Sequence, residues 1–195
     1  MSAPYRLTPP ESLAAIEHDT RALGFTMASD PAAGSLLRTL AASKPGGALL
    51  ELGTGTGLAT AWLLSGMDPG STLLSVDNDE AVVAVARRHL GHDARVTFAV
   101  GDGTRRLASL VAEGRTFDLI FADAWPGKYT SLDEALALVR VGGLYVVDDM
   151  LPQPNWPEDH PARVAGLLET LGGRADLAVT LLSWSTGIVI AARIR

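Results

Sequence analysis

The stretch Leu49-Leu50-Glu51-Leu52-Gly53-Thr54-Gly55-Thr56-Gly57 decides the fold class of this chain. Its first four residues predict a buried strand, and its three glycines predict a sharp turn into a helix expected over residues 57–66. Glycines let the backbone turn tightly and approach a ligand closely, and the helix that follows points its unpaired N–H groups at the same place. The stretch therefore indicates a strand, a ligand-binding loop and a helix in succession. The alternative is a tight turn that binds no ligand.

Apolar runs and helical patterns alternate from residue 48 onward, which is typical of βαβ units with helices on both faces of a parallel sheet. Strands are expected near residues 48–52, 72–76, 95–100, 117–122, 143–148, 176–182 and 187–193. Helices are expected near residues 57–66, 79–90, 104–112, 131–140 and 161–171. Because only residues 183–186 join the last two strands, these must form an antiparallel hairpin. The predicted class is α/β, with six parallel strands and a reversed last strand.

Capping signals predict where three helices begin. Thr8-Pro9-Pro10-Glu11 and Ser131 with Glu134 read as capping boxes, and Asp30-Pro31 opens a second helix in the same way as the first. Leu13, Ile16, Thr20 and Leu23 are expected to share a face of the first helix, which ends at Gly24, and Gly142-Gly143 is expected to end the helix over 131–140.

The composition describes one domain over residues 1–195. The chain is 47% hydrophobic, and 16 basic against 22 acidic residues give a net charge of −6. This balance argues against a nucleic-acid partner, which needs clustered Lys and Arg. Without cysteine, disulfides, thiolate nucleophiles and Cys-based zinc sites are excluded. Since no apolar run reaches the ~18 residues of a membrane span and the start lacks the core of a secretory signal, we expect a cytoplasmic protein with no membrane partner.

Acidic residues follow the expected strands at the edge where such a sheet binds its ligand. Asp77 ends the second strand, where a carboxylate can accept both hydroxyls of a ribose, while Asn78 or Asp79 can cap the next helix. Gly101-Asp102-Gly103 ends the third strand, where the carboxylate can accept from the exocyclic amine of a base. The glycine spacing does not fit the dinucleotide fingerprint, so a nicotinamide oxidoreductase is disfavoured. These strand ends predict a nucleoside-bearing cofactor without a pyrophosphate, such as S-adenosylmethionine.

At this point the chain resembles the class I S-adenosylmethionine-dependent methyltransferases, most closely the small cation-dependent O-methyltransferases related to catechol O-methyltransferase. The resemblance spans residues 27–195 and rests on five segments: 51–57, 75–77, 101–103, 117–123 and 142–149. It implies a Rossmann-like sheet in the order 3-2-1-4-5-7-6, with residues 1–45 forming part of the cover over cofactor and acceptor. Glu51 and the glycine loop would hold the methionine portion, Asp77 the ribose, and Asp102 with Gly103 the adenine. The cofactor site implied in this way comprises Met27, Ser29, Glu51, Gly53, Thr54, Gly55, Gly57, Asp77, Asn78, Gly101, Asp102, Gly103, Asp123 and Trp125.

The resemblance also implies a divalent cation, magnesium or alternatively calcium, held by Asp123, Asp148 and Asp149. Asp149 departs from the subgroup, which has Asn there. Three carboxylates in one crevice raise one another's pKa unless a cation lies between them, and oxygen ligands suit magnesium. The alternative is that Asp148 and Asp149 bond only to nearby backbone while Asp123 orients the cofactor.

The subgroup's base is a lysine three residues after the first metal-binding Asp, where this chain has Pro126. Lys128, two places later, is the candidate base, and Asp123 is the second candidate catalytic residue. Alternatively, the cation alone lowers the pKa of the acceptor hydroxyl and Lys128 is a solvated loop residue.

Aromatic residues are expected to form the walls of an acceptor site. The candidates are Trp125, Tyr129 and the loop over residues 152–157, which carries Trp156. His160 is a possible alternative base but is more simply a cap or surface residue.

The sequence therefore predicts O-methylation of a small, catechol-like acceptor and leaves a homodimer open. The alternatives are a metal-independent methyltransferase for another atom or a macromolecule, and a non-catalytic cofactor binder.

Overall fold

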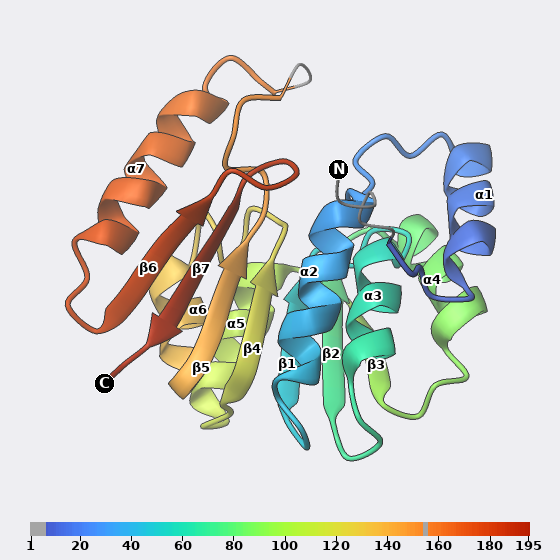
Figure 1. The fold of residues 1–195 in the computed structure, drawn as a ribbon, viewed down its shortest axis with the longest axis horizontal. Coiled ribbons are helices and arrows are strands. Elements are labelled where there is room, and N and C mark those ends of the chain that lie inside the picture. Colours follow the sequence, from blue (N-terminus) through green and yellow to red (C-terminus); the bar gives the residue numbers. More distant parts are fainter. Residues whose placement is uncertain (1–6, 154–155) are drawn as a thin grey trace, which may run out of the picture.

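The computed structural model describes residues 7–153 and 156–195, which form a seven-stranded sheet in the order β3-β2-β1-β4-β5-β7-β6 (Figure 1). The strands are β1 (Ala48–Leu52), β2 (Thr72–Asp77), β3 (Val96–Val100), β4 (Phe117–Ala122), β5 (Val139–Val147), β6 (Leu177–Leu182) and β7 (Ile188–Arg193). The helices are α1 (Leu13–Leu23), α2 (Pro31–Ala42), α3 (Leu58–Gly66), α4 (Glu80–Leu90), α5 (Gly103–Ala112), α6 (Leu132–Leu138) and α7 (His160–Gly172).

The pairing of the strands confirms the predicted class and the implied order. Strands β1 to β5 pair in parallel, whereas β7 runs antiparallel to both β5 and β6. The carboxyl ends of the parallel strands therefore meet along one edge, as the sequence predicts for a ligand site.

Helices cover both faces of the sheet, and each face has its own apolar core (Figure 1). One core joins the sheet to α1, α2 and α3, with Trp62 among its largest fully buried side chains. The other joins the sheet to α5, α6 and α7 through residues such as Leu107, Leu136 and Leu167. Helices α2 and α3 approach so closely that a Cβ on Gly34 would lie 2.1 Å from the Trp62 ring.

The predicted helix starts need two corrections. Helix α1 begins after Ser12 without a side-chain cap, so the box over residues 8–11 is wrong, and Leu23 is 45% exposed. Ser131 has a φ of 54° and caps nothing with its side chain, so that capping box is wrong as well. Asp30 does cap α2, by accepting a hydrogen bond from the Ala32 amide at 2.8 Å.

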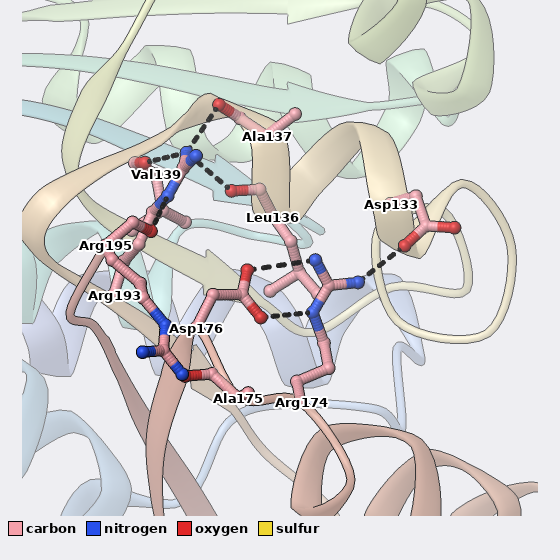
Figure 2. Close-up of polar contacts among 9 residues, drawn as sticks. All are labelled: Asp133, Leu136, Ala137, Val139, Arg174, Ala175, Asp176, Arg193 and Arg195. Atoms are coloured by element: carbon pink, nitrogen blue, oxygen red, sulfur yellow. Dashed lines mark hydrogen bonds and ion pairs between the residues drawn. The ribbon is translucent and has the colours of Figure 1, made fainter.

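Strand β5 begins at Val139, earlier than expected, and contains Gly142-Gly143 within it. Arginine contacts fix the short α6 beside this strand at the amino end of the sheet (Figure 2). Arg174 joins Asp133 of α6 to Asp176 before β6. Arg193 of β7 donates to three carbonyls where α6 passes into β5, those of Leu136, Ala137 and Val139.

Within residues 7–153 and 156–195, none of the helices combines the length and apolar character that a bilayer-spanning segment requires.

Candidate functional site

The glycine loop after β1 is held against the acid that ends β2. Gly53 and Gly55 have φ values of 102° and 51°, a region that glycine adopts without strain. A Cβ on Gly53 would lie 2.8 Å from the Asp123 carbonyl oxygen, so the loop can pass β4 this closely only with glycine. The Gly55 amide donates to Asp77 Oδ2 at 2.8 Å, and this bond fixes the loop over the end of β2.

The carboxylate of Asp77 does not cap the next helix. Asp79 caps α4 by accepting from the Ala81 amide at 2.8 Å, as the sequence allowed. Asp77 Oδ1 accepts from the Asp79 amide at 3.0 Å, so each Asp77 oxygen has one backbone donor and retains a lone pair. Asp102 caps α5 through Oδ1, which accepts from the Arg105 amide at 2.9 Å. Asp77 is therefore a preformed double acceptor at the cavity edge.

A cavity of about 480 Å³, the glycine-loop cavity, lies over the ends of β1, β2 and β3. Its size suits a small-molecule ligand. Twelve of the fourteen predicted cofactor residues line it: Met27, Ser29, Gly53, Thr54, Gly55, Asp77, Asn78, Gly101, Asp102, Gly103, Asp123 and Trp125. Phe25 and Pro126 also line it and were missed, because nothing in their local sequence distinguishes them from ordinary loop residues.

Glu51 and Gly57 do not line this cavity. Glu51 is fully buried one layer behind the loop, where Oε2 accepts from Thr60 Oγ1 at 2.6 Å and Ser75 Oγ at 2.5 Å. Its Oε1 has no partner among the described residues. Burial raises the pKa of the Glu51 carboxyl to about 7, although the hydrogen bonds from Ser75 and Thr60 lower it.

A second cavity of about 870 Å³, the acidic cavity, lies over the ends of β4 and β5. Asp123, Lys128, Asp148 and Asp149 line it, together with the predicted aromatic walls. The two cavities are contiguous, since eight residues line both, among them Ser29, Asp123 and Trp125.

Lys128 lies inside the acidic cavity and is not a solvated loop residue. It is 3% exposed, and its Nζ donates to the Asp148 carbonyl oxygen at 2.6 Å. Burial lowers the pKa of Lys128, while the charges of Asp123, Asp149 and Asp148 oppose that shift. Burial and the charge of Asp148 raise the pKa of Asp123 well above its usual range.

The three aspartates do not gather into a metal-binding group. Asp148 turns Oδ1 toward two donors, the Asp149 amide at 2.7 Å and the Thr186 hydroxyl. Asp123 Oδ2 accepts from Ser29 Oγ at 3.3 Å. Among the described residues no three His, Asp or Glu side chains are placed to hold a metal ion. The alternative of bonding only to nearby backbone holds for Asp148 in part, through the Asp149 amide, but the contact with the Thr186 hydroxyl of the β6–β7 turn was not indicated by the sequence.

Aromatic rings form one wall of the acidic cavity, as predicted for Trp125, Tyr129 and Trp156. Two residues of the predicted loop, Pro154 and Asn155, lie outside the described residues. His160 is 8% exposed, which corrects the expectation of a surface residue, and its ring stacks 4.4 Å from that of Trp156. The Tyr129 hydroxyl lies 3.0 Å from His160 Nε2. Burial raises the pKa of Tyr129 to about 12 and lowers that of His160. Tyr129 therefore keeps its proton and can donate a hydrogen bond to a neutral imidazole.

A protein-family model described as "Methyltransferase domain" matches residues 50–150. A curated protein of Mycobacterium marinum, named "Putative O-methyltransferase", is 34% identical over 125 residues, which cover 60% of this chain and 54% of that protein. The chain thus spans about half the length of the curated relatives that it matches.

Solved structures share the fold over nearly the whole chain. The O-methyltransferase TomG from Streptomyces achromogenes, involved in tomaymycin synthesis and solved with SAM, is 25% identical with a TM-score of 0.83 over 97% of this chain and 92% of TomG. An O-methyltransferase from Bacillus cereus, solved with SAH, has the same TM-score at 20% identity over 96% of this chain and 92% of its own. At that lower identity the likeness concerns the fold alone.

Proposed function

Because the chain belongs to the methyltransferase-domain family, we propose that it transfers the methyl group of S-adenosylmethionine to an oxygen of a small-molecule acceptor. The names of its relatives support oxygen as the receiving atom. A catechol-like acceptor and a cytoplasmic location, both expected from the sequence, belong to the same proposal.

The contiguity of the two cavities carries this proposal. The glycine-loop cavity suits the donor, and the acidic cavity suits the acceptor. Ser29, Asp123 and Trp125 line both, so the methyl group would cross between them at this shared wall. Displacement reactions need the two reactants held in line and shielded from water, which adjoining cavities with aromatic walls can provide.

The residues of the glycine-loop cavity fit the cofactor that the family implies. Asp77 offers a free lone pair on each oxygen to two ribose hydroxyls. Asp102 and Gly103 line the same cavity and would contact the adenine, and a Cβ on Gly103 would come within 2.8 Å of Pro126. Glu51 does not reach the cavity and would support the loop from behind through its hydrogen bonds with Thr60 and Ser75.

When bound, the cofactor supplies an electrophilic methyl group on sulfur. As the acceptor oxygen bonds to this carbon, the bond to sulfur breaks and the hydroxyl proton must leave. We assign the proton to Asp123, because it lines both cavities and would lie beside the transferred methyl group. We assign Lys128 the role of binding the acceptor oxygen rather than the expected role of base, because the charges of Asp123, Asp149 and Asp148 favour its ammonium form, which has no lone pair to accept a proton. The divalent cation is not part of this proposal, since the residues present do not fit it.

Isothermal titration calorimetry with S-adenosylhomocysteine tests the cofactor site. We expect Asp77→Asn to weaken binding by about tenfold or more, which corresponds to about 1.4 kcal/mol. Glu80→Gln is the matched control, because it removes an acid from the exposed start of α4, outside both cavities. Equal binding by wild type and Asp77→Asn would contradict the assignment of Asp77.

Mass spectrometry of reactions with S-adenosylmethionine and a panel of hydroxylated aromatic compounds tests the transfer. A mass gain of one methyl group on an acceptor oxygen supports the proposal. Tight binding of the cofactor product without turnover on any acceptor would instead support the non-catalytic binder.

A further inference from the structure

Lys128 reaches the acidic cavity through a turn built for that purpose. Gly127 has a φ of 86°, and a Cβ there would lie 2.3 Å from the Leu52 side chain, so only glycine fits. The buried Tyr145 hydroxyl donates to the Gly127 carbonyl, and the Lys128 amide donates to the Trp125 carbonyl at 3.2 Å. These contacts fix the backbone of the turn, and the lysine side chain that follows is 3% exposed.

The Lys128 side chain lies where the sequence predicts a divalent cation. It lines the same cavity as the three aspartates and interacts electrostatically with each of them. A buried cation needs compensating negative charge or oxygen ligands, and a group of carboxylates needs a cation. The three aspartates therefore supply the negative charge that a buried Lys128 needs, and Lys128 offsets part of theirs without a metal ion.

Two oxygens of Asp148 that a metal ion could use are engaged elsewhere. Asp148 Oδ1 accepts from Thr186 and from the Asp149 amide, and the Asp148 carbonyl accepts from Lys128 Nζ. Magnesium demands close to six oxygens in octahedral geometry, and calcium six to eight. An ion entering this site would have to displace Lys128 from the Asp148 carbonyl, and the positive charge of the lysine would still repel it.

The amine retains donors for a ligand. An ammonium has three N–H groups, and the described contacts of Nζ include one hydrogen bond, to Asp148. Its other close contact is the Tyr129 ring, whose centroid lies 5.2 Å away. Two donors therefore remain to bind an oxygen in the acidic cavity.

We propose that Lys128 takes the place of the divalent cation, offsetting part of the negative charge of Asp123, Asp148 and Asp149 and binding the acceptor oxygen, so that this chain needs no metal ion. The statement about the acceptor rests on the proposed function, but the statement about metal binding does not.

Binding of Mn²⁺, a spectroscopic probe for magnesium sites, tests the inference without any assay of activity. After dialysis against EDTA, wild-type protein is expected to leave the electron paramagnetic resonance signal of free Mn²⁺ unchanged up to millimolar concentrations. Lys128→Met removes the charge and opens the cluster, so Mn²⁺ affinity should rise by about tenfold or more. Combining it with Asp123→Asn should abolish that gain, because one of the three carboxylates is neutralised.

Lys44→Met is the matched control. Lys44 is the other lysine of the chain, and its Nζ likewise donates to a backbone carbonyl, that of Gly142 at 2.8 Å, but it lines neither cavity. This variant should bind Mn²⁺ no better than wild type.

Submillimolar binding of Mn²⁺ by wild type would overturn the inference, and this measurement does not depend on any variant folding. An unchanged affinity in a folded Lys128→Met protein would overturn it as well. Loss of methyl transfer on every acceptor would count against the proposed function and leave the result for metal binding intact.

Discussion

Glu51→Gln should remove the pH dependence of folding stability that the buried Glu51 carboxyl causes. The Glu51 carboxyl is fully buried behind the glycine loop, and its Oε1 lacks a partner among the described residues. Burial raises its pKa from 4.5 to about 7. The folded state therefore holds a proton on Glu51 that the unfolded state releases at lower pH.

The size of the effect follows from this difference in pKa. Because the folded pKa exceeds the unfolded value, the stabilisation is complete below about pH 4.5 and is lost as the pH rises through about 7. The pKa gap of about 2.5 corresponds, at 1.36 kcal/mol per pKa unit, to about 3 kcal/mol. Glutamine keeps the shape and an oxygen for Thr60 and Ser75 but never ionises. The variant should thus gain up to about 3 kcal/mol relative to wild type on going from about pH 4.5 to about pH 9.

Urea unfolding of the cofactor-free protein at several pH values between about 4.5 and about 9 measures this difference in free energy. Comparing each variant with wild type at the same pH cancels the contributions of all other titrating groups. Glu80→Gln serves as the control, because its side chain is 65% exposed and its difference from wild type should stay nearly flat. If the Glu51→Gln difference is as flat as that of the control, the carboxyl does not titrate as the structure requires and the reasoning is wrong.

Two further predictions concern folding stability. Gly34→Ala should destabilise the fold by about 2 kcal/mol or more, because the new Cβ would lie 2.1 Å from Trp62. Gly166→Ala, at an open position of α7, should stabilise the fold by about 0.5–1 kcal/mol, and equal effects of the two substitutions in urea unfolding would contradict both predictions. Tyr129→Phe should cost about 1 kcal/mol by leaving the 8%-exposed His160 without its hydroxyl partner, and an unchanged urea midpoint would show that this hydrogen bond contributes nothing.

The strands could be predicted because each is a short apolar run bounded by turn residues. The prediction was weakest at α6 and β5, where Val139 continues the apolar stripe of the helix in sequence yet begins the strand in the structure. Such a boundary depends on the pairing of Val139 with Phe117 of β4, which lies far away in the sequence. Ser131 likewise has the right residue type for a cap, but its positive φ prevents it from capping.

The candidate site could be predicted as a set of strand ends but not as a set of contacts. Parallel topology brings Asp77, Asp123 and Asp148 to one edge whatever their side chains do. Which oxygen meets which donor depends on side-chain directions, and so the bond from Lys128 to the Asp148 carbonyl carried no sequence signal. His160 was misjudged for a related reason, since its burial comes from Tyr129 and Trp156 on other segments.

The β6–β7 hairpin has a practical consequence for anyone who shortens this chain. The family match ends at residue 150, and every predicted cofactor-binding, metal-binding and catalytic residue except the alternative base His160 lies before that point. Yet the hairpin turn supplies the Thr186 hydroxyl to Asp148, and Gly187 comes so near the Leu151 amide that a Cβ would lie 2.5 Å away. A protein cut to the matched region would retain Asp123, Asp148 and Asp149 but lose the Thr186 hydroxyl that orients the Asp148 carboxylate. The structural unit that holds the candidate site therefore extends to the β6–β7 hairpin, and a shortened chain meant to keep that site must include it.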